Sequence, residues 1–293
     1  MQIKIVPSIL MLLSYVFIYS QEPTEIYLFE LNEQESGITL SNPINISNRP
    51  GYDNQPSFTE DGTGILFTSF RDGQADISKY FMADQYRVWI TNTEFNEFSP
   101  MPFPGKKKYF SCVRMKADGS QNLYKYAYKK RAPEPLIPDL TIGYYMWYTE
   151  KSVVSFVIGD IESLQVSNFK YDIRYPIQYN IGRSISQIPV KAELGPDLIS
   201  YISMSHEEPE IYSINPLNSE SKYIADVISG SQDLAWTKSG CMLMGIGNKI
   251  FKFHPVKDKQ WTAVEINCDL PFDGVSRLVV SPDGTKLAVV VRE

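Results

Sequence analysis

The sequence predicts an all-β fold, a six-bladed β-propeller whose ring is closed by the N-terminal strand. Aromatic residues make up 13% of the chain and prolines number 19, a composition typical of many short strands separated by turns. A turn-and-strand unit recurs with a period of about 44 residues, which is the repeat length of propeller blades. The last unit is incomplete, and the strand that it lacks is found near the N-terminus.

The first twenty residues predict a secretory signal peptide. Lys4 precedes an apolar stretch from Ile5 to Tyr19, and a small residue, Ser20, comes before the expected cleavage at Gln21. A retained membrane anchor is the alternative, but the stretch is short for a membrane span and contains Pro7. We therefore expect residues 1–20 to be removed and residues 21–293 to form one exported propeller domain, periplasmic or secreted, monomeric and without a stable membrane span.

Net charge limits the possible partners, and cysteine content limits the possible disulfide bonds. The formal charge of -6 offers no broad attraction to nucleic acid. Three cysteines are an odd number for a disulfide framework in an exported protein. Cys112 and Cys241 are expected to be buried strand residues, with a bridge between Cys241 and Cys268 as the alternative.

The first repeat unit, residues 55–80, shows the order of elements within a blade. A strand ends at Phe58, a turn follows at Asp61-Gly62, a second strand runs from Ile65 to Phe70, and a polar loop leads to a third strand. The turn has counterparts at Gly105, Lys151, Gly195, Gly240 and Gly284. The third strand has counterparts at residues 122–126, 163–167, 210–214 and 249–253.

Closure of the ring follows from the sixth unit, "SPDGTKLAVVV", which contains a turn and a second strand and no third strand. The segment "EIYLFEL" at residues 25–31 matches the third strands of the other units, and residues 37–45 are expected to be the fourth. A β-sandwich would not explain this permuted match. Asp61, Asp283 and Gly284 are assigned a backbone role in two-residue hairpins.

Two units resemble the repeats of TolB-type propellers. The segments "NQPSFTEDGTGILFTSFRDGQADI" and "SPDGTKLAVVV" are similar to that family's P-x-[FW]-[ST]-x-D-G turn, the aliphatic strand after it and the [FS]-x-R-x-G-x-x-[DE]-[IL] segment. The period extends the resemblance over residues 25–293, although the middle units depart from the motif, and we expect no counterpart of the family's separate N-terminal domain. The resemblance implies binding of a protein or peptide partner across one face and the channel mouth.

Strand alternation predicts which face carries the site. In a four-stranded antiparallel blade, the links between blades and the second turns lie on the face opposite the Asp-Gly turns, and loops held by a rigid scaffold concentrate binding residues. The candidate binding residues on this face are Asp53, Asn54, Arg71, Glu97, Tyr144, Tyr145, Arg183, His206, Asp233 and Arg277. No cofactor or metal is expected, because only two histidines are present and no H-x-x-x-H or C-x-x-C spacing occurs.

These observations favour an exported, non-enzymatic binding or scaffold propeller that recognises a protein or peptide partner in the cell envelope. The alternative is a carbohydrate- or peptide-processing enzyme at the channel mouth, with Asp53, Glu97, Asp233 and His206 as candidate acids and bases. A lectin-like role using Tyr144, Tyr145 and Trp147 as stacking surfaces is a third hypothesis.

Overall fold

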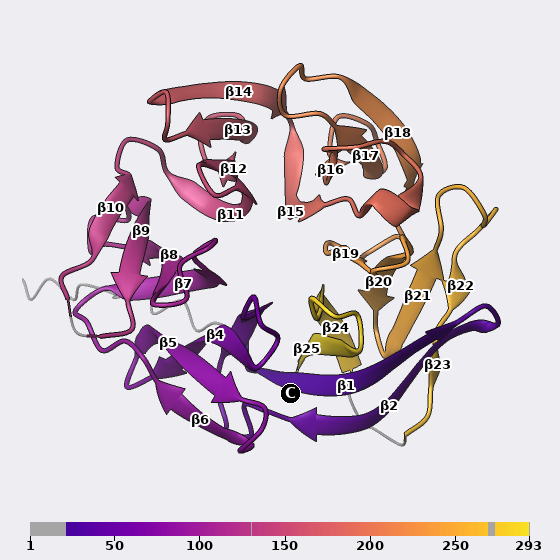
Figure 1. Cartoon of the computed structure of the whole chain (residues 1–293), viewed down its shortest axis with the longest axis horizontal. Coiled ribbons are helices and arrows are strands. Elements are labelled where there is room, and N and C mark those ends of the chain that lie inside the picture. Colours follow the sequence, from indigo (N-terminus) through magenta and orange to yellow (C-terminus); the bar gives the residue numbers. More distant parts are fainter. Residues whose placement is uncertain (1–21, 130, 269–272, 293) are drawn as a thin grey trace, which may run out of the picture.

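Six β-sheets are arranged as a ring around a central axis (Figure 1). The computed structural model describes residues 22–129, 131–268 and 273–292. These residues confirm the predicted all-β, six-bladed propeller. The predicted signal peptide and its cleavage position at Gln21 lie outside the described residues.

Blades one to five are antiparallel sheets of four strands that follow chain order from the axis outward. Blade one contains β3 (Asp53–Phe58), β4 (Gly64–Arg71), β5 (Gln74–Phe81) and β6 (Tyr86–Trp89). Blade two contains β7 (Asn96–Pro102), β8 (Tyr109–Met115), β9 (Gln121–Ala127) and β10 (Glu134–Ile137), and blade three contains β11 (Ile142–Thr149), β12 (Ser152–Val157), β13 (Ser163–Asn168) and β14 (Ile173–Tyr179). Blade four contains β15 (Ile181–Gln187), β16 (Ile199–Ser203), β17 (Glu210–Ile214) and β18 (Ser221–Asp226), and blade five contains β19 (Ala235–Trp236), β20 (Met242–Ile246), β21 (Lys249–Phe253) and β22 (Thr262–Ala263).

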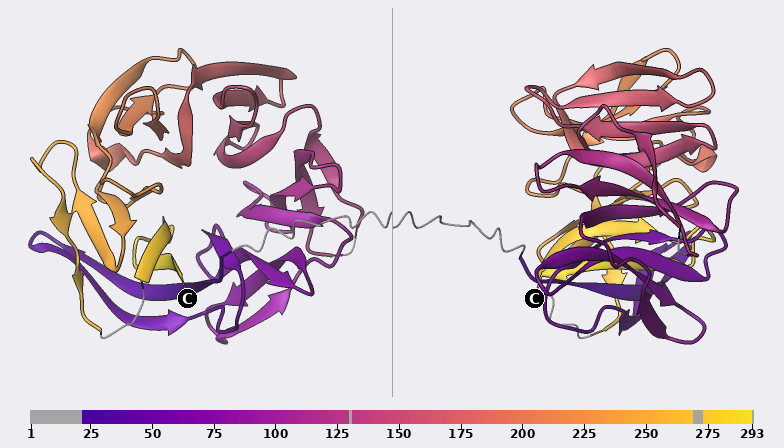
Figure 2. Two further views of the ribbon diagram at one scale, coloured as in Figure 1. Left: turned by 180° about the vertical axis from the view of Figure 1, so that it is seen from behind. Right: turned by 90° about the vertical axis from the view of Figure 1, so that its left-hand side faces the viewer.

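Blade six joins the two ends of the described chain. Its order from the axis is β24 (Asp273–Val280), β25 (Lys286–Arg292), β1 (Thr24–Gln34) and β2 (Gly37–Asn45). β1 pairs with β25 from Thr24 to Glu30, so the N-terminal strand takes the third place in this sheet (Figure 2). A short fifth strand, β23 (Glu265–Ile266), pairs in parallel with β2 and has no counterpart in the sequence prediction.

The apolar core lies between blades. Each of the six clusters of buried apolar side chains in the described residues joins two neighbouring sheets. β1 shows the pattern that produces this: Ile26 and Leu28 contact blade one, whereas Phe29 and Leu31 face blade five. Successive side chains on a strand point to opposite faces, so every blade buries both faces only if the ring is closed.

The Asp-Gly turns are longer than the predicted two-residue hairpins. The loop between β24 and β25 spans five residues, Ser281 to Thr285. Gly284 has a φ of 80°, as its backbone role requires. Asp283 acts through its side chain, because its carboxylate accepts hydrogen bonds from the Ser281 hydroxyl and from the Thr285 amide at 3.0 Å. The aspartate therefore stabilises a wider turn than the sequence predicted.

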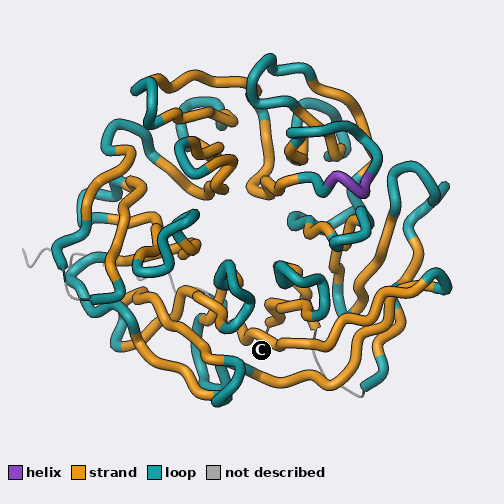
Figure 3. The backbone as a smooth tube through the Cα atoms, in the orientation of Figure 1, coloured by secondary structure: helices purple, strands orange, loops and turns teal. Residues whose placement is uncertain are grey.

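Loops and turns connect the strands around the whole ring (Figure 3). The first turn of blade four contains a short 3₁₀ helix, η1 (Val190–Ala192), where a simple turn around Gly195 was expected. Cys112 is buried in β8, and Cys241 lies immediately before β20 as a free thiol, so it forms no bridge to Cys268. Over the described ranges, no helix has the length and hydropathy needed to cross a membrane.

Candidate binding site at the channel mouth

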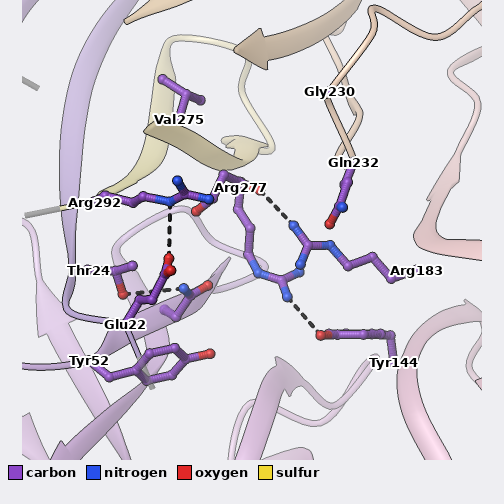
Figure 4. A pocket seen from close by; sticks show the side chains of 12 residues that line it. Glu22, Thr24, Tyr52, Tyr144, Arg183, Gly230, Gln232, Val275, Arg277 and Arg292 are labelled. Atoms are coloured by element: carbon purple, nitrogen blue, oxygen red, sulfur yellow. Dashed lines mark hydrogen bonds and ion pairs between the residues drawn. The ribbon is translucent and has the colours of Figure 1, made fainter. Parts of the chain in front are cut away.

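A pocket of about 370 Å³ lies on the face where the links between blades meet (Figure 4). Its walls come from the links and the first residues of innermost strands, together with Thr24 at the start of β1 and Arg292 at the end of β25. The innermost strands all leave this face in the same direction, so their first residues meet around the axis. In blade six, β1 and β25 are antiparallel neighbours, so the beginning of β1 and the end of β25 lie together at this face.

Arg277, the fifth residue of β24, is stacked on the ring of Tyr144 from β11. Its guanidinium carbon lies 4.8 Å from the ring centroid, and its Nη2 donates a hydrogen bond to the Tyr144 hydroxyl at 3.0 Å. A planar guanidinium held against an aromatic face loses much of its rotational freedom. Tyr144 therefore fixes the direction in which the remaining N–H groups of Arg277 point.

Arg183, the third residue of β15, extends into the same pocket, where its guanidinium lies beside that of Arg277 (Figure 4). Its Nη2 donates to the carbonyl oxygen of Ser276 at 3.0 Å, while its Nε is buried without a hydrogen-bond partner. Burial, followed by the nearby positive charge of Arg277, lowers the pKa of Arg183. Because Arg183 lines the pocket and is only partly buried, its guanidinium can donate to an acceptor on a ligand there.

The Asp233 carboxylate lies near this pair along the central channel. It accepts backbone hydrogen bonds from Leu234 at 3.2 Å and Leu278 at 3.3 Å, and burial raises its pKa. None of the ion pairs within 4.0 Å formed by described side chains involves Arg183 or Arg277. The two guanidinium groups therefore keep N–H donors and positive charge directed at the pocket.

Tyr52 adds a neutral donor to the same wall. Burial raises the pKa of Tyr52 to about 12, so its hydroxyl remains protonated at neutral pH. Its ring contacts Phe70 edge-on with centroids 5.3 Å apart, and its hydroxyl extends into the pocket on the side of Tyr144 (Figure 4). A ligand oxygen at this position can accept a hydrogen bond from Tyr52 as well as from the arginines.

The rim of the pocket is formed where the paired strands β1 and β25 of blade six meet blade one. Glu22 and Arg292 form an ion pair at 3.2 Å, and both side chains are exposed. Asn54 donates to the Thr24 hydroxyl at 3.3 Å. An exposed ion pair contributes little to stability, so the rim pair can open to admit a ligand at small cost.

The structure brings together six of the ten predicted site residues. Asn54, Tyr144, Arg183 and Arg277 line this pocket, and Asp233 and Tyr145 line a space of about 200 Å³ farther along the channel. The Tyr145 hydroxyl, however, donates to Ser111 at 2.8 Å within the interface between blades two and three. Its position is therefore structural, unlike that of its neighbour Tyr144.

Arg71 and His206 lie away from the pocket. Arg71 pairs with Asp76 at 3.1 Å and stacks over Trp89 at 4.4 Å within blade one. His206 is exposed in the turn between β16 and β17, 3.5 Å from Glu210. No group of three or more His, Cys, Asp or Glu side chains in the described parts of the chain could hold a metal ion.

Asp53 and Glu97 are fully buried inside blades and do not reach the pocket. Asp53 accepts a hydrogen bond from the Ser69 hydroxyl and pairs with Arg49 at 3.3 Å. Glu97 accepts a hydrogen bond from the Tyr126 hydroxyl at 3.0 Å. These contacts engage each carboxylate within its blade, although Asp53 Oδ2 and Glu97 Oε2 accept no hydrogen bond from the described residues.

Tyr52 and Arg292 line the pocket without having been predicted. Tyr52 immediately precedes Asp53 in the first link, and alternation along the chain places Tyr52 and Asn54 on the pocket side and Asp53 on the other. Once Asn54 is known to lie on the pocket side, alternation selects Tyr52 in place of Asp53. The position of Arg292 could have been inferred from the predicted pairing of β25 with β1, because this pairing brings the end of β25 to the same face as the start of β1.

The buried carboxyl of Asp53 predicts a pH effect on stability. Burial raises its pKa to about 6, against a reference value of 3.8. As pH rises from about 4 to 6, the Asp53 carboxyl loses its proton in the unfolded state but keeps it in the folded state. Deprotonation therefore favours unfolding in this range, and the contribution of Asp53 to the free energy of unfolding falls by roughly 3 kcal/mol. Asp53→Asn, which cannot ionise, is expected to show a smaller fall than the parent in urea denaturation between pH 4 and 7. Identical pH dependence of the two proteins would contradict the assignment.

Solved structures with the same architecture were found by comparison. A protein designated TolB from Agrobacterium tumefaciens matches with a TM-score of 0.70 at 13% identity, over 93% of this chain and 99% of that one. The fold is a TolB-like six-bladed propeller. TolB from Acinetobacter baumannii matches with a TM-score of 0.57 at 12% identity, over 92% of this chain and 64% of that one. No protein-family model matches the sequence, and no curated protein matches it.

The TolB-like fold also occurs in an enzyme. An oligogalacturonate lyase in complex with manganese matches this chain with a TM-score of 0.56 at 12% identity, over 87% of this chain and 82% of that one. At this level of identity the similarity establishes the architecture alone. The choice between binding and catalysis therefore depends on the side chains at the channel mouth.

Proposed function

We propose that this propeller is an exported, non-enzymatic binding module that recognises a protein or peptide partner with its link face, the face formed by the links between blades and the second turns. The observation that carries the proposal is the pair of guanidinium groups, Arg183 and Arg277, which lie side by side at the channel mouth with no described carboxylate within 4.0 Å of either. Both arginines belong to the innermost strands, so their positions are fixed before a partner arrives.

The arrangement favours binding over the enzymatic alternative. The four residues considered as acids and bases belong to four different blades, and only Asp233 lines the central channel. Asp53 and Glu97 are enclosed by hydrogen bonds within their blades, and His206 is exposed on a peripheral turn. Acid-base catalysis requires such groups within hydrogen-bond reach of one substrate, and these four do not converge.

A quantitative pull-down from cell-envelope extracts tests the proposal. The parent protein is compared with the double variant Arg183→Glu, Arg277→Glu, which reverses the charge at the channel mouth. Recovery of the specific partner is expected to fall on the order of tenfold or more, because charges matched across an interface become like charges. Thermal unfolding of the variant verifies that it is folded.

The matched control is Lys238→Glu, Lys259→Glu, which changes the net charge equally on the opposite face. Lys238 lies in the first turn of blade five and Lys259 in its third turn, and both side chains are exposed. This control is expected to recover the partner as well as the parent does. Equal recovery by all three proteins would reject the link face as the binding surface.

A further inference from the structure

A second pocket, of about 480 Å³, adjoins the arginine pocket on the link face. The two pockets share Arg183, Gly230 and Gln232, so a ligand in one lies beside the other. The second pocket is predominantly apolar. Its apolar walls are formed by Phe156 of β12 in blade three, by Ile181 at the start of β15, and by Ile202, Met204 and Pro209 around the second turn of blade four, and Glu162 also lines it.

We infer that the two pockets form one bipartite site for an extended peptide segment, in which a carboxylate lies between Arg183 and Arg277 and an adjacent large apolar side chain enters the apolar pocket beside blade four. This inference rests on the proposed function and names the chemistry that the partner must carry. A guanidinium pair presents N–H groups in the planar geometry that the two oxygens of a carboxylate accept.

Local charge favours a singly charged group over a doubly charged one. The two arginines contribute two positive charges, and Asp233 lies near both of them along the channel. The rim pair of Glu22 and Arg292 adds no net charge. A carboxylate balances the remaining charge, whereas a phosphate dianion would bring excess negative charge toward Asp233.

The apolar pocket argues for a peptide in place of a small anion. Met204 is 50% exposed, so a large apolar side chain remains in water beside a charged pocket. A free inorganic anion or a sugar acid would leave that surface uncovered, while an apolar side chain seated there gains the free energy of burial. Gln232 is exposed at the junction of the pockets, and its amide can both donate to and accept from a peptide backbone.

Two peptide libraries test this inference with the intact protein. Both contain random hexapeptides, one with a free C-terminal carboxylate and the other with a C-terminal amide, and bound peptides are identified by mass spectrometry. Sequences that place a carboxylate next to Leu, Ile, Met or Phe are expected to be enriched at least tenfold, since hydrogen bonds to charged groups are the strong ones. Enrichment in the free-carboxylate library alone identifies a C-terminus as the ligand, and enrichment of internal Asp or Glu in both libraries identifies a side chain.

Two variants separate the halves of the site. Arg183→Gln is expected to lose the preference for a carboxylate and keep that for an apolar neighbour, whereas Met204→Ser is expected to do the reverse. Lys238→Gln on the opposite face should retain both preferences. A merely structural role for these residues would reduce both preferences together.

Three results would overturn the inference. They are absence of any enriched sequence, equal enrichment with and without a carboxylate, and competition by sodium galacturonate or inorganic phosphate as strong as that by the enriched peptides. If the envelope pull-down still depends on the arginines in any of these cases, the proposed function stands and only the peptide chemistry is rejected. If the pull-down is also unaffected, the link face itself is rejected.

Discussion

Replacing Phe29 with alanine is expected to lower the free energy of unfolding by about 3–5 kcal/mol, the usual cost of removing a buried phenylalanine ring. Phe29 is fully buried on β1 and belongs to the apolar cluster between blades five and six. It lies directly opposite Leu287 of β25, in the antiparallel pair that completes the ring. Chemical denaturation monitored by tryptophan fluorescence measures the effect.

The matched control is Tyr179→Ala in β14, which removes an aromatic side chain that is 50% exposed. Surface substitutions of this kind usually change stability by less than about 0.5 kcal/mol. The comparison distinguishes a strand that closes a ring from a chain terminus that frays, because a frayed terminus would tolerate the loss of Phe29. A cost below about 1 kcal/mol for Phe29→Ala would show that closure does not depend on β1.

The fold could be predicted from the sequence because the repeat imposes the same local chemistry many times. Most units supply a turn, an aliphatic strand and a third strand with aromatic residues, and the match of residues 25–31 to those third strands shows where the two ends of the chain meet in one blade. The short strand β23 and the helix η1 could not be predicted in this way. Both lie in recurring connections that depart from the repeat: β23 in the link between blades five and six, and η1 in the first turn of blade four, which is longer than the other first turns.

The site was predictable in location and only partly in detail. Strand alternation selected the face on which Asn54, Tyr144, Arg183 and Arg277 line one pocket. It did not identify which of two adjacent residues in a link faces the axis, because the starting phase of each innermost strand depends on bulges. β3, for example, shifts register between Asn54 and Ser57. The contact of Asp53 with Ser69 likewise joins segments that sequence spacing alone does not bring together.

Two kinds of arginine at the link face illustrate how environment decides role. Arg71 lies beside a carboxylate from its own blade, Asp76, at 3.1 Å, so its charge is satisfied within the fold. Arg277 instead contacts a tyrosine from a different blade, and Arg183 contacts a backbone carbonyl. Neither of these contacts neutralises a guanidinium, so residues of the same type and similar position differ in their capacity to bind an anionic partner.

Gly240→Ala is expected to lower the free energy of unfolding by about 3–5 kcal/mol, by combining backbone strain with a steric overlap. Gly240 has a φ of 100° in the first turn of blade five. A Cβ atom there would lie 2.5 Å from the backbone nitrogen of Ala192 in η1. Backbone atoms cannot move aside as a flexible side chain can, so blades four and five would have to separate at this contact. Thermal and urea unfolding measure the loss.

Gly119→Ala separates the two causes. Gly119 also has a positive φ, 83°, but a Cβ at that position would meet no heavy atom within 4 Å. This control carries the backbone strain alone, about 1–2 kcal/mol. The difference between the two variants is therefore the cost of forcing blade five away from η1. If Gly240→Ala costs no more than Gly119→Ala, the contact between η1 and this turn does not hold the two blades together.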